Sequence, residues 1–174
     1  MNRLSVGILS CALVFCLMGC SQKQSQVLEK RGRVNDLAGV LTEETELSLT
    51  SDLEQYERET CHQLFVLVVD SLKGETIQEV SSRTALQWEI GHPALNNGIL
   101  LSVAIDEGQA RIEVGSALET IIEQGAAERI LKSEMFPLFK AGKIDKGIIE
   151  GVGSIMMEAR KLRIPDELRP PVCR

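Results

Sequence analysis

The sequence has few of the residues from which catalytic and metal-binding sites are usually built. Its 174 residues include two histidines, His62 and His92, and neither belongs to an H-E-x-x-H or C-x-x-C motif. A transition-metal site of ordinary composition is therefore hard to assemble. The G-x-S-x-G elbow of serine hydrolases and the G-x-x-x-x-G-K-[ST] loop of nucleotide-binding proteins are also absent. The commonest signatures of a hydrolase or a nucleotide-binding protein are thus missing.

Clusters of basic residues and long apolar runs are missing as well. The chain carries a net charge of −6 and has no lysine/arginine cluster with interleaved aromatic residues. Because a phosphate backbone is bound by a positive face, nucleic acid is excluded as an expected partner. Beyond residue 20, no apolar run reaches the roughly 18 residues that cross a bilayer.

The first twenty residues have the pattern of an export signal. Arg3 precedes an apolar stretch from Val6 to Met18, which is too short for a permanent membrane helix, and the segment closes on Gly19-Cys20. This ending resembles the lipobox of bacterial lipoproteins, in which the cysteine is acylated and becomes the new first residue. We therefore expect a signal peptide at residues 1–19 and a membrane lipid on Cys20. An ordinary secretory signal and a membrane anchor are the alternatives.

The residues after Cys20 are polar and lack periodicity up to residue 33. Residues 20–33 are therefore expected to be the lipidated cysteine and a flexible tether, which holds the domain outside the cytoplasm. Ser21 resembles the sorting preference for the outer membrane, so a cell with two membranes would carry the protein on its outer membrane, facing the periplasm. Cleavage removes Arg3 and no acidic residue, so the net charge of −6 becomes −7.

Two cysteines remain in the mature chain, Cys61 and Cys173. In an oxidising compartment they can pair as a disulfide or stay as free thiols. Their separation in sequence does not decide between the two, because pairing requires Cα atoms within about 7 Å.

Apolar periodicity from residue 34 onwards predicts one globular domain over residues 34–163. Thr42 and the acidic residues that follow it start a helix, and the nearly continuous apolar run 63–69 is typical of a strand buried on both faces. Thr76 and Glu79 form a capping box at the start of a second helix. Residues 98–105 predict another buried strand, which is joined to the alternating segment 111–114 as a hairpin.

This order of elements predicts an α/β fold. The strand, helix and strand between Leu64 and Ile105 imply one right-handed parallel crossover. Beyond Ser116 the chain is helical until Pro137 interrupts it, and the apolar spacing from Ile148 to Leu162 predicts a last amphipathic helix. Residues 164–174 form a proline-containing tail. The expected architecture is a single-domain α/β/α sandwich with a small mixed sheet and helices on both faces.

The segment Val34-Asn35-Asp36-Leu37-Ala38-Gly39-Val40-Leu41 resembles the opening of the TPM domain family. That family is named for a thylakoid lumen protein, a photosystem II repair protein and a nematode receptor modulator. Further matches follow in the family's order and spacing, at Trp88-Glu89-Ile90-Gly91, Asn97-Gly98-Ile99-Leu100-Leu101, Arg111-Ile112-Glu113-Val114-Gly115, Leu118-Glu119, Arg129-Ile130 and Phe136-Pro137-Leu138-Phe139. The resemblance covers roughly residues 34 to 160 and implies an α/β sandwich fold.

The resemblance also implies a loop site. Some family members are acid phosphatases or calcium binders, and others are accessory proteins in the assembly or repair of membrane complexes. The binding-loop candidates in this chain are Asp36, Asn96, Asn97, Glu119, Glu123 and Gln124.

Two of these positions depart from the family pattern. The family usually has aspartate where this chain has Asn96 and Gln124, so two carboxylates are replaced by neutral amides. Calcium binding is expected to be weakened, with Asp36 and Glu119 as the remaining candidate metal ligands. For Asn96 and Asn97, the alternative is a structural turn with left-handed backbone before Gly98.

We therefore expect an accessory or binding module whose partner is another envelope protein. It would need no cofactor, although weakened calcium binding is possible. The alternative is a weak acid phosphatase or a calcium-dependent hydrolase of the TPM type.

Overall fold

Four strands form one mixed sheet in the computed structural model, which describes residues 28–173. They are β1 (Val34–Asp36), β2 (Gln63–Val69), β3 (Gly98–Ala104) and β4 (Gln109–Val114), and they lie in the order β1-β2-β3-β4. The first three strands are parallel, and β4 returns antiparallel to β3 as the predicted hairpin. Both predicted buried strands are thus at the centre of the sheet. The expected signal peptide, Cys20 and the first part of the tether lie outside the described residues.

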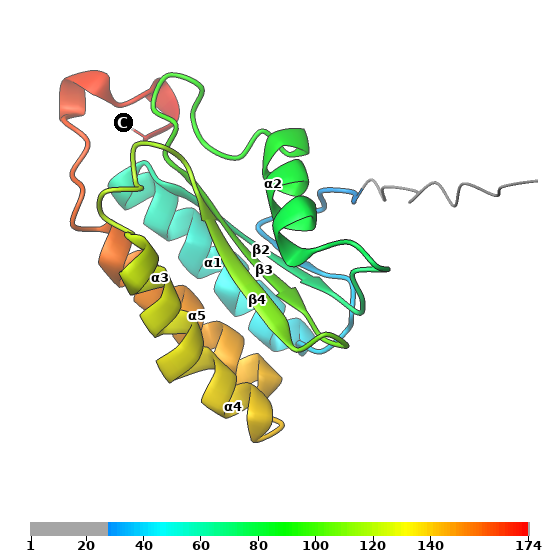
Figure 1. The fold of residues 1–174 in the computed structure, drawn as a ribbon. Coiled ribbons are helices and arrows are strands. Elements are labelled where there is room, and N and C mark those ends of the chain that lie inside the picture. Colours follow the sequence, from blue (N-terminus) through cyan, green and yellow to red (C-terminus); the bar gives the residue numbers. More distant parts are fainter. Residues whose placement is uncertain (1–27, 174) are drawn as a thin grey trace, which may run out of the picture.

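Helices cover both faces of this sheet (Figure 1). α1, α3, α4 and α5 lie on one face and α2 lies on the other. The helical elements are α1 (Glu43–Thr60), α2 (Ile77–Gln87), α3 (Gln124–Arg129), the π-helical segment η1 (Ile130–Met135), α4 (Phe136–Lys140), α5 (Ile144–Ala159) and the 3-10 turns η2 (Asp166–Leu168) and η3 (Pro171–Cys173). The α/β/α sandwich is therefore confirmed. Within the described residues, no helix has the length and apolar character needed to span a membrane.

The larger core lies between the sheet and the four-helix face. Alternate residues of β2, including Val66 and Val68, point into it and are completely buried. From the helices come Leu53 of α1 and Ile148 and Ile155 of α5, which are also completely buried. The apolar spacing that predicted the last helix is therefore the spacing of the residues that α5 buries.

The opposite face is covered by α2 and also by the segment before β1. Leu28 is 7% exposed, and its carbonyl accepts a 2.8 Å hydrogen bond from the indole N–H of Trp88. Lys30 Nζ donates to the Trp88 carbonyl at 2.9 Å and lies 4.6 Å from the centre of the Phe65 ring. Residues 28–33 therefore belong to the domain, which corrects the expected tether. A polar sequence concealed this packing because lysine can lay its stem along an aromatic surface.

The chain makes two parallel connections, β1-α1-β2 and β2-α2-β3. The second is the predicted crossover, and the first was not predicted because β1 has only three residues. Each connection leads to the next strand in the same direction across the sheet, first from β1 to β2 and then from β2 to β3. However, α1 and α2 cover opposite faces. The two connections therefore have opposite hands, and one departs from the usual right-handed rule.

The region between β4 and α5 is less regular than predicted. Leu118 lies in a turn, and the helix proper begins only at Gln124. Pro137 does not end the helical run, because it lies in the first turn of α4, which follows η1 without a break. In α5, a Cβ added at Gly151 would lie 2.4 Å from Met135 Sδ, so this glycine permits close packing of α5 on η1.

The C-terminal residues are also packed on the domain. Ile164 is 6% exposed and Cys173 is 4% exposed, and both lie in a small core with Cys61. Cys61 and Cys173 form a disulfide, with Cα atoms 5.5 Å apart. The proline-containing tail expected from residue 164 onwards is therefore packed across the end of α1 over residues 164–173.

Candidate functional site

Asp36, the first candidate ligand, closes the loop between β1 and α1. Its Oδ1 accepts hydrogen bonds from the backbone N–H groups of Ala38 at 3.1 Å and Gly39 at 2.9 Å. Its Oδ2 accepts the N–H of Leu41 at 2.7 Å. Both carboxylate oxygens thus satisfy main-chain donors of a tight turn, a common role for aspartate.

Asn96 and Asn97 precede β3 and have different roles. Asn96 is exposed and has a φ angle of 48°, so the predicted left-handed turn before Gly98 is confirmed there. Asn97 is completely buried. Its side-chain NH2 donates to the Cys61 carbonyl, and its Oδ1 accepts the N–H of His92 at 3.0 Å. The Asn97 amide therefore joins two loops and has no face left toward solvent.

Two glycines let these loops approach closely. A Cβ at Gly98 would lie 2.3 Å from the Ile90 carbonyl oxygen, and a Cβ at Gly115 would lie 2.1 Å from that of Asn96. Real Cβ atoms do not come so near a carbonyl oxygen, so any side chain at either position would push the loops apart. In the two motifs of the family resemblance that contain Gly98 and Gly115, these glycines thus allow the backbones of neighbouring loops to touch.

The structure separates the two candidate metal ligands. Asp36 is level with Val68, near the carboxyl end of β2, whereas Asn97 lies at the other end, beside Gln63. Glu119 follows β4 on the Asn97 side, where the N–H of Ala117 donates to the Asn96 carbonyl. Val68 and Gln63 are five residues apart along β2, so the level of Asp36 and the level of Asn97 are about 17 Å apart along the strand. The expectation that Asp36 and Glu119 share one cation is therefore wrong, because the sheet holds them at opposite ends.

The other candidates lie near Glu119. Glu123 is exposed and caps α3 through its carbonyl, which accepts from the N–H groups of Ala126 and Ala127. Gln124 is the first residue of α3. Neither Glu119, Glu123 nor Asp36 belongs to a group of three converging His, Cys, Asp or Glu ligand atoms within residues 28–173.

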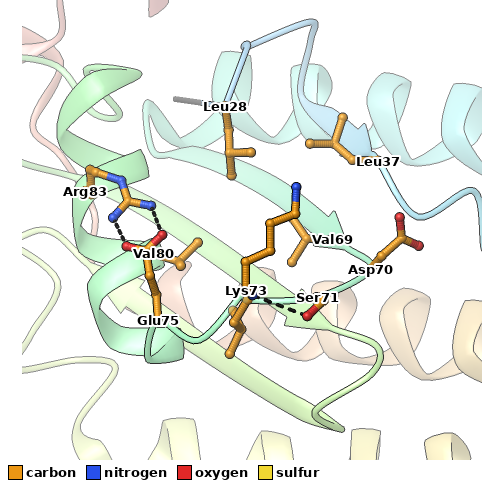
Figure 2. Close-up of a pocket in the computed structure, with 10 residues that line it drawn as sticks. Leu28, Leu37, Val69, Asp70, Ser71, Lys73, Glu75, Val80 and Arg83 are labelled. Atoms are coloured by element: carbon orange, nitrogen blue, oxygen red, sulfur yellow. Dashed lines mark hydrogen bonds and ion pairs between the residues drawn. The ribbon is translucent and has the colours of Figure 1, made fainter. Parts of the chain in front are cut away.

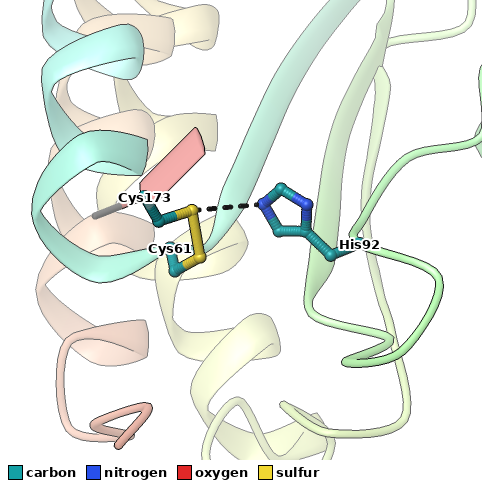
Figure 3. Close-up of side chains that lie close together, drawn as sticks. All are labelled: Cys61, His92 and Cys173. Carbon is teal, nitrogen blue, oxygen red and sulfur yellow. Dashed lines mark hydrogen bonds between the residues drawn. A yellow bond between two sulfur atoms is a disulfide. The ribbon is translucent and has the colours of Figure 1, made fainter. Parts of the chain in front are cut away.

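One such group does exist in the described part of the chain, and it consists of Cys61, His92 and Cys173 (Figure 3). His92 Nε2 lies 3.5 Å from Cys173 Sγ. The two sulfur atoms are bonded to each other, so they offer no thiolate to a metal ion. The group is a buried crosslink with a histidine against it.

A buried polar cluster that the sequence did not reveal adjoins this disulfide. Glu57 is 7% exposed and forms an ion pair with Arg33. One of its oxygens, Oε1, accepts from Gln63 Nε2 at 2.7 Å and lies 3.4 Å from His92 Nε2. Burial lowers the pKa of His92, and the positive charge of Arg33 lowers it further. These contacts fasten the segment before β1 to α1, so the cluster has a structural role.

The carboxyl ends of β1 and β2, where many α/β sheets bind ligands, offer only a small pocket. Figure 2 shows this pocket between Leu28, Val80 and the loop that carries Ser71 and Lys73. Its volume of about 150 Å³ is below the roughly 300 Å³ at which ligand pockets usually begin. Beside it, both guanidinium NH2 groups of Arg83 bind the carboxylate of Glu75. This geometry favours a packed wall over a ligand site.

The comparisons with known proteins agree with the fold. The TPM domain model matches residues 34–158. No curated protein matches the chain. The N-terminal domain of a P. gingivalis protein, solved by NMR, is 28% identical, with a TM-score of 0.66 over 72% of this chain and 80% of that one.

Two further NMR structures are more distant in sequence. The BA42 protein of the psychrophilic bacterium Bizionia argentinensis is 16% identical, with a TM-score of 0.63 over 76% of this chain and 90% of that one. The N-terminal domain of the cg2496 protein of Corynebacterium glutamicum is 14% identical, with a TM-score of 0.58 over 78% of this chain and 88% of that one. At such identities the likeness shows the fold alone.

Proposed function

The chain belongs to the TPM domain family, and on this premise we propose that it is a lipid-anchored module that binds another protein of the bacterial envelope, without metal-dependent catalysis of its own. Its anchor is an acyl chain on Cys20, which lies outside the described residues. Its place is the extracytoplasmic side of a membrane, and in a cell with two membranes it is the periplasmic side of the outer membrane.

The proposed lack of metal-dependent catalysis rests on what the candidate ligand side chains bond to in this fold. A hard cation needs several negative oxygen atoms at one place. Here both oxygens of Asp36 accept main-chain hydrogen bonds, and Glu119 lies at the opposite end of the sheet. The Asn97 amide is buried between two loops. A calcium site built from these residues would first have to break the turns that they hold together.

Purification from membranes tests the module. The full chain, expressed in a bacterium at its native level and solubilised in mild detergent, should bring down one reproducible envelope protein in a fixed ratio. A Cys20→Ala variant should leave the membrane fraction, because one buried acyl chain contributes about 0.8 kcal/mol per CH2 group. Recovery of the wild-type protein alone, in repeated preparations, would contradict the proposal.

A calcium titration tests the competing phosphatase or calcium-dependent hydrolase. Because a ligand that binds only the folded state raises the thermal midpoint, millimolar calcium should leave the midpoint unchanged. Glu119→Gln is the matched variant, since it removes one exposed charge and no known contact with the fold. A calcium-dependent rise in the midpoint, or phosphatase activity, that disappears in this variant would replace the module with the enzyme.

A further inference from the structure

The outer edge of β4 is unpaired among the described strands. In the sheet order β1-β2-β3-β4, this strand pairs with β3 on one side and with no described strand on the other. Edge strands with unpaired main-chain groups are templates for another strand, so proteins commonly block them with charges, proline or a bulge. Residues 109–114 contain no proline, and their pairing with β3 is continuous. The strand carries two charges, Arg111 and Glu113, but these form an ion pair with each other.

The hydrogen-bond pattern identifies the groups that face outward. The Gly115 N–H donates to the Gly98 carbonyl at 2.8 Å, so alternate residues of β4, Arg111 and Glu113 among them, turn their main-chain groups toward β3. Ala110, Ile112 and Val114 turn theirs away. Across residues 28–173, no main-chain or side-chain hydrogen bond reaches these outward groups.

The outer edge of β4 lines a groove of about 550 Å³. Ile77 from the start of α2 stands on one side, and Ile122 and Leu131 from the α3 region stand on the other. Ala110, Ile112 and Val114 form part of the lining, so the unpaired main-chain groups and apolar side chains occur together. This combination fits an extended peptide, whose main chain pairs with the edge while alternate side chains pack on the walls.

The charges of the groove specify the kind of peptide. Glu119 and Glu128 line it, and both are exposed, but Glu128 already accepts from Lys132 Nζ at 2.8 Å. The one basic residue of the lining, Arg111, donates from Nε to Glu113 Oε2 at 2.7 Å, so the groove offers the charge of Glu119. The whole chain is acidic, with a net charge of −6. A segment with lysine or arginine beside its apolar residues is therefore complementary to this edge.

A second copy of this chain fits the edge less well than a single segment. Pairing of two β4 strands about Ile112 would place Arg111 opposite Glu113 of the other copy, which is favourable. However, both copies carry a net charge of −6 and an exposed Glu119 beside the groove, and like charges oppose their association. A single basic segment meets no such repulsion.

We propose that β4 binds an extended, basic and apolar segment of the partner protein as a fifth strand of the sheet. The inference rests on the proposed function, because it names the surface through which the module would bind. It requires no change in the fold, since the outward groups of Ala110, Ile112 and Val114 are already aligned.

Amide hydrogen exchange on the full chain in detergent tests the docking edge directly. The probe is an acetylated hexapeptide of alternating lysine and valine, and the control is the same peptide with glutamate in place of lysine. Without peptide, the amides of Arg111 and Glu113 should be protected and those of Ala110, Ile112 and Val114 should exchange. The lysine peptide should slow exchange of the three outward amides at least tenfold, and the glutamate peptide should not. Unchanged exchange at saturating lysine peptide would overturn the proposal.

Two variants locate the contact. Ala110→Pro removes an outward N–H without removing a bond to β3, so it should weaken the lysine peptide at least tenfold while β3–β4 protection is retained. Glu119→Lys, which leaves the strand itself intact, should reverse the preference between the two peptides. Retained binding of the lysine peptide in both variants would place the contact elsewhere on the surface.

Co-purification separates this inference from the proposed function. If the wild-type chain recovers an envelope partner and both variants lose it, the docking edge is supported. If both variants keep the partner, the docking edge is wrong and the module stands. A concentration-dependent dimer of the wild-type chain that Ala110→Pro abolishes would assign the edge to a second copy and overturn the proposal.

Discussion

Removal of the Cys61–Cys173 disulfide should be among the most destabilising single changes to this domain. The two cysteines are 112 residues apart, so the crosslink closes a loop of about two thirds of the unfolded chain. The chain-entropy relation for such a loop gives about 4.8 kcal/mol at 25 °C. Compact unfolded states reduce this figure, and we expect a loss of about 3–4 kcal/mol. A domain of this size has about 5–15 kcal/mol in total, so the loss is a large fraction of its stability.

Urea unfolding of the Cys61→Ala/Cys173→Ala variant measures this loss. Alanine suits both sites because they are buried in an apolar cluster, where serine would add an unpaired hydroxyl. The matched control is the wild-type chain with a thiol reductant, which should unfold within about 1 kcal/mol of the variant, since both lack the crosslink. A difference below about 1 kcal/mol between the variant and the oxidised wild type would refute the entropic argument. Mass spectrometry of the unreduced sample verifies that the bond was present.

Three smaller changes test other parts of the structure. Gly115→Ala should cost about 2–3 kcal/mol in urea unfolding because its Cβ would lie 2.1 Å from the Asn96 carbonyl oxygen, whereas Gly125→Ala, with nothing within 4 Å, should be neutral or stabilising. Burial lowers the pKa of His62, so the unfolded chain binds a proton that the folded chain does not. Stability should therefore fall as the pH falls below about 6.5, and a His62→Gln variant should show a smaller fall. Trp88→Phe removes the indole N–H bonded to the segment before β1, and trypsin should then cut that segment faster than in the wild type.

The sequence was informative where one local rule decides the structure. Thr76 and Glu79 form the predicted capping box, with the Thr76 N–H donating to Glu79 Oε2 at 2.8 Å and the Glu79 N–H donating to Thr76 Oγ1 at 3.1 Å. Thr42 likewise accepts from the Thr45 N–H at the start of α1. Caps, apolar stripes and buried strands depend on neighbours in sequence, so a single chain reveals them.

The predicted grouping of Asp36 with Glu119 failed because residue type alone does not say what a side chain bonds to. Asp36 has the chemistry of a cation ligand, but both of its carboxylate oxygens accept hydrogen bonds from N–H groups of the following turn. The level of Asp36 along the sheet depends on the parallel pairing of β1 with β2, which a three-residue strand does not announce. Pairing register is a long-range property, so the distance between Asp36 and Glu119 was not predictable.

The packing of Leu28 changes what a lipid on Cys20 would do. If the fold began at Val34, a fully extended connection from Cys20 would reach about 50 Å, whereas the eight steps to Leu28 reach about 29 Å at most. Leu28 lies on the α2 face against Phe65 and Trp88, and its segment leads directly into β1. β4 is the far edge of the sheet, three strand spacings or about 14 Å from β1. The segment that carries the proposed anchor thus leads into β1, the edge strand opposite the proposed docking edge on β4.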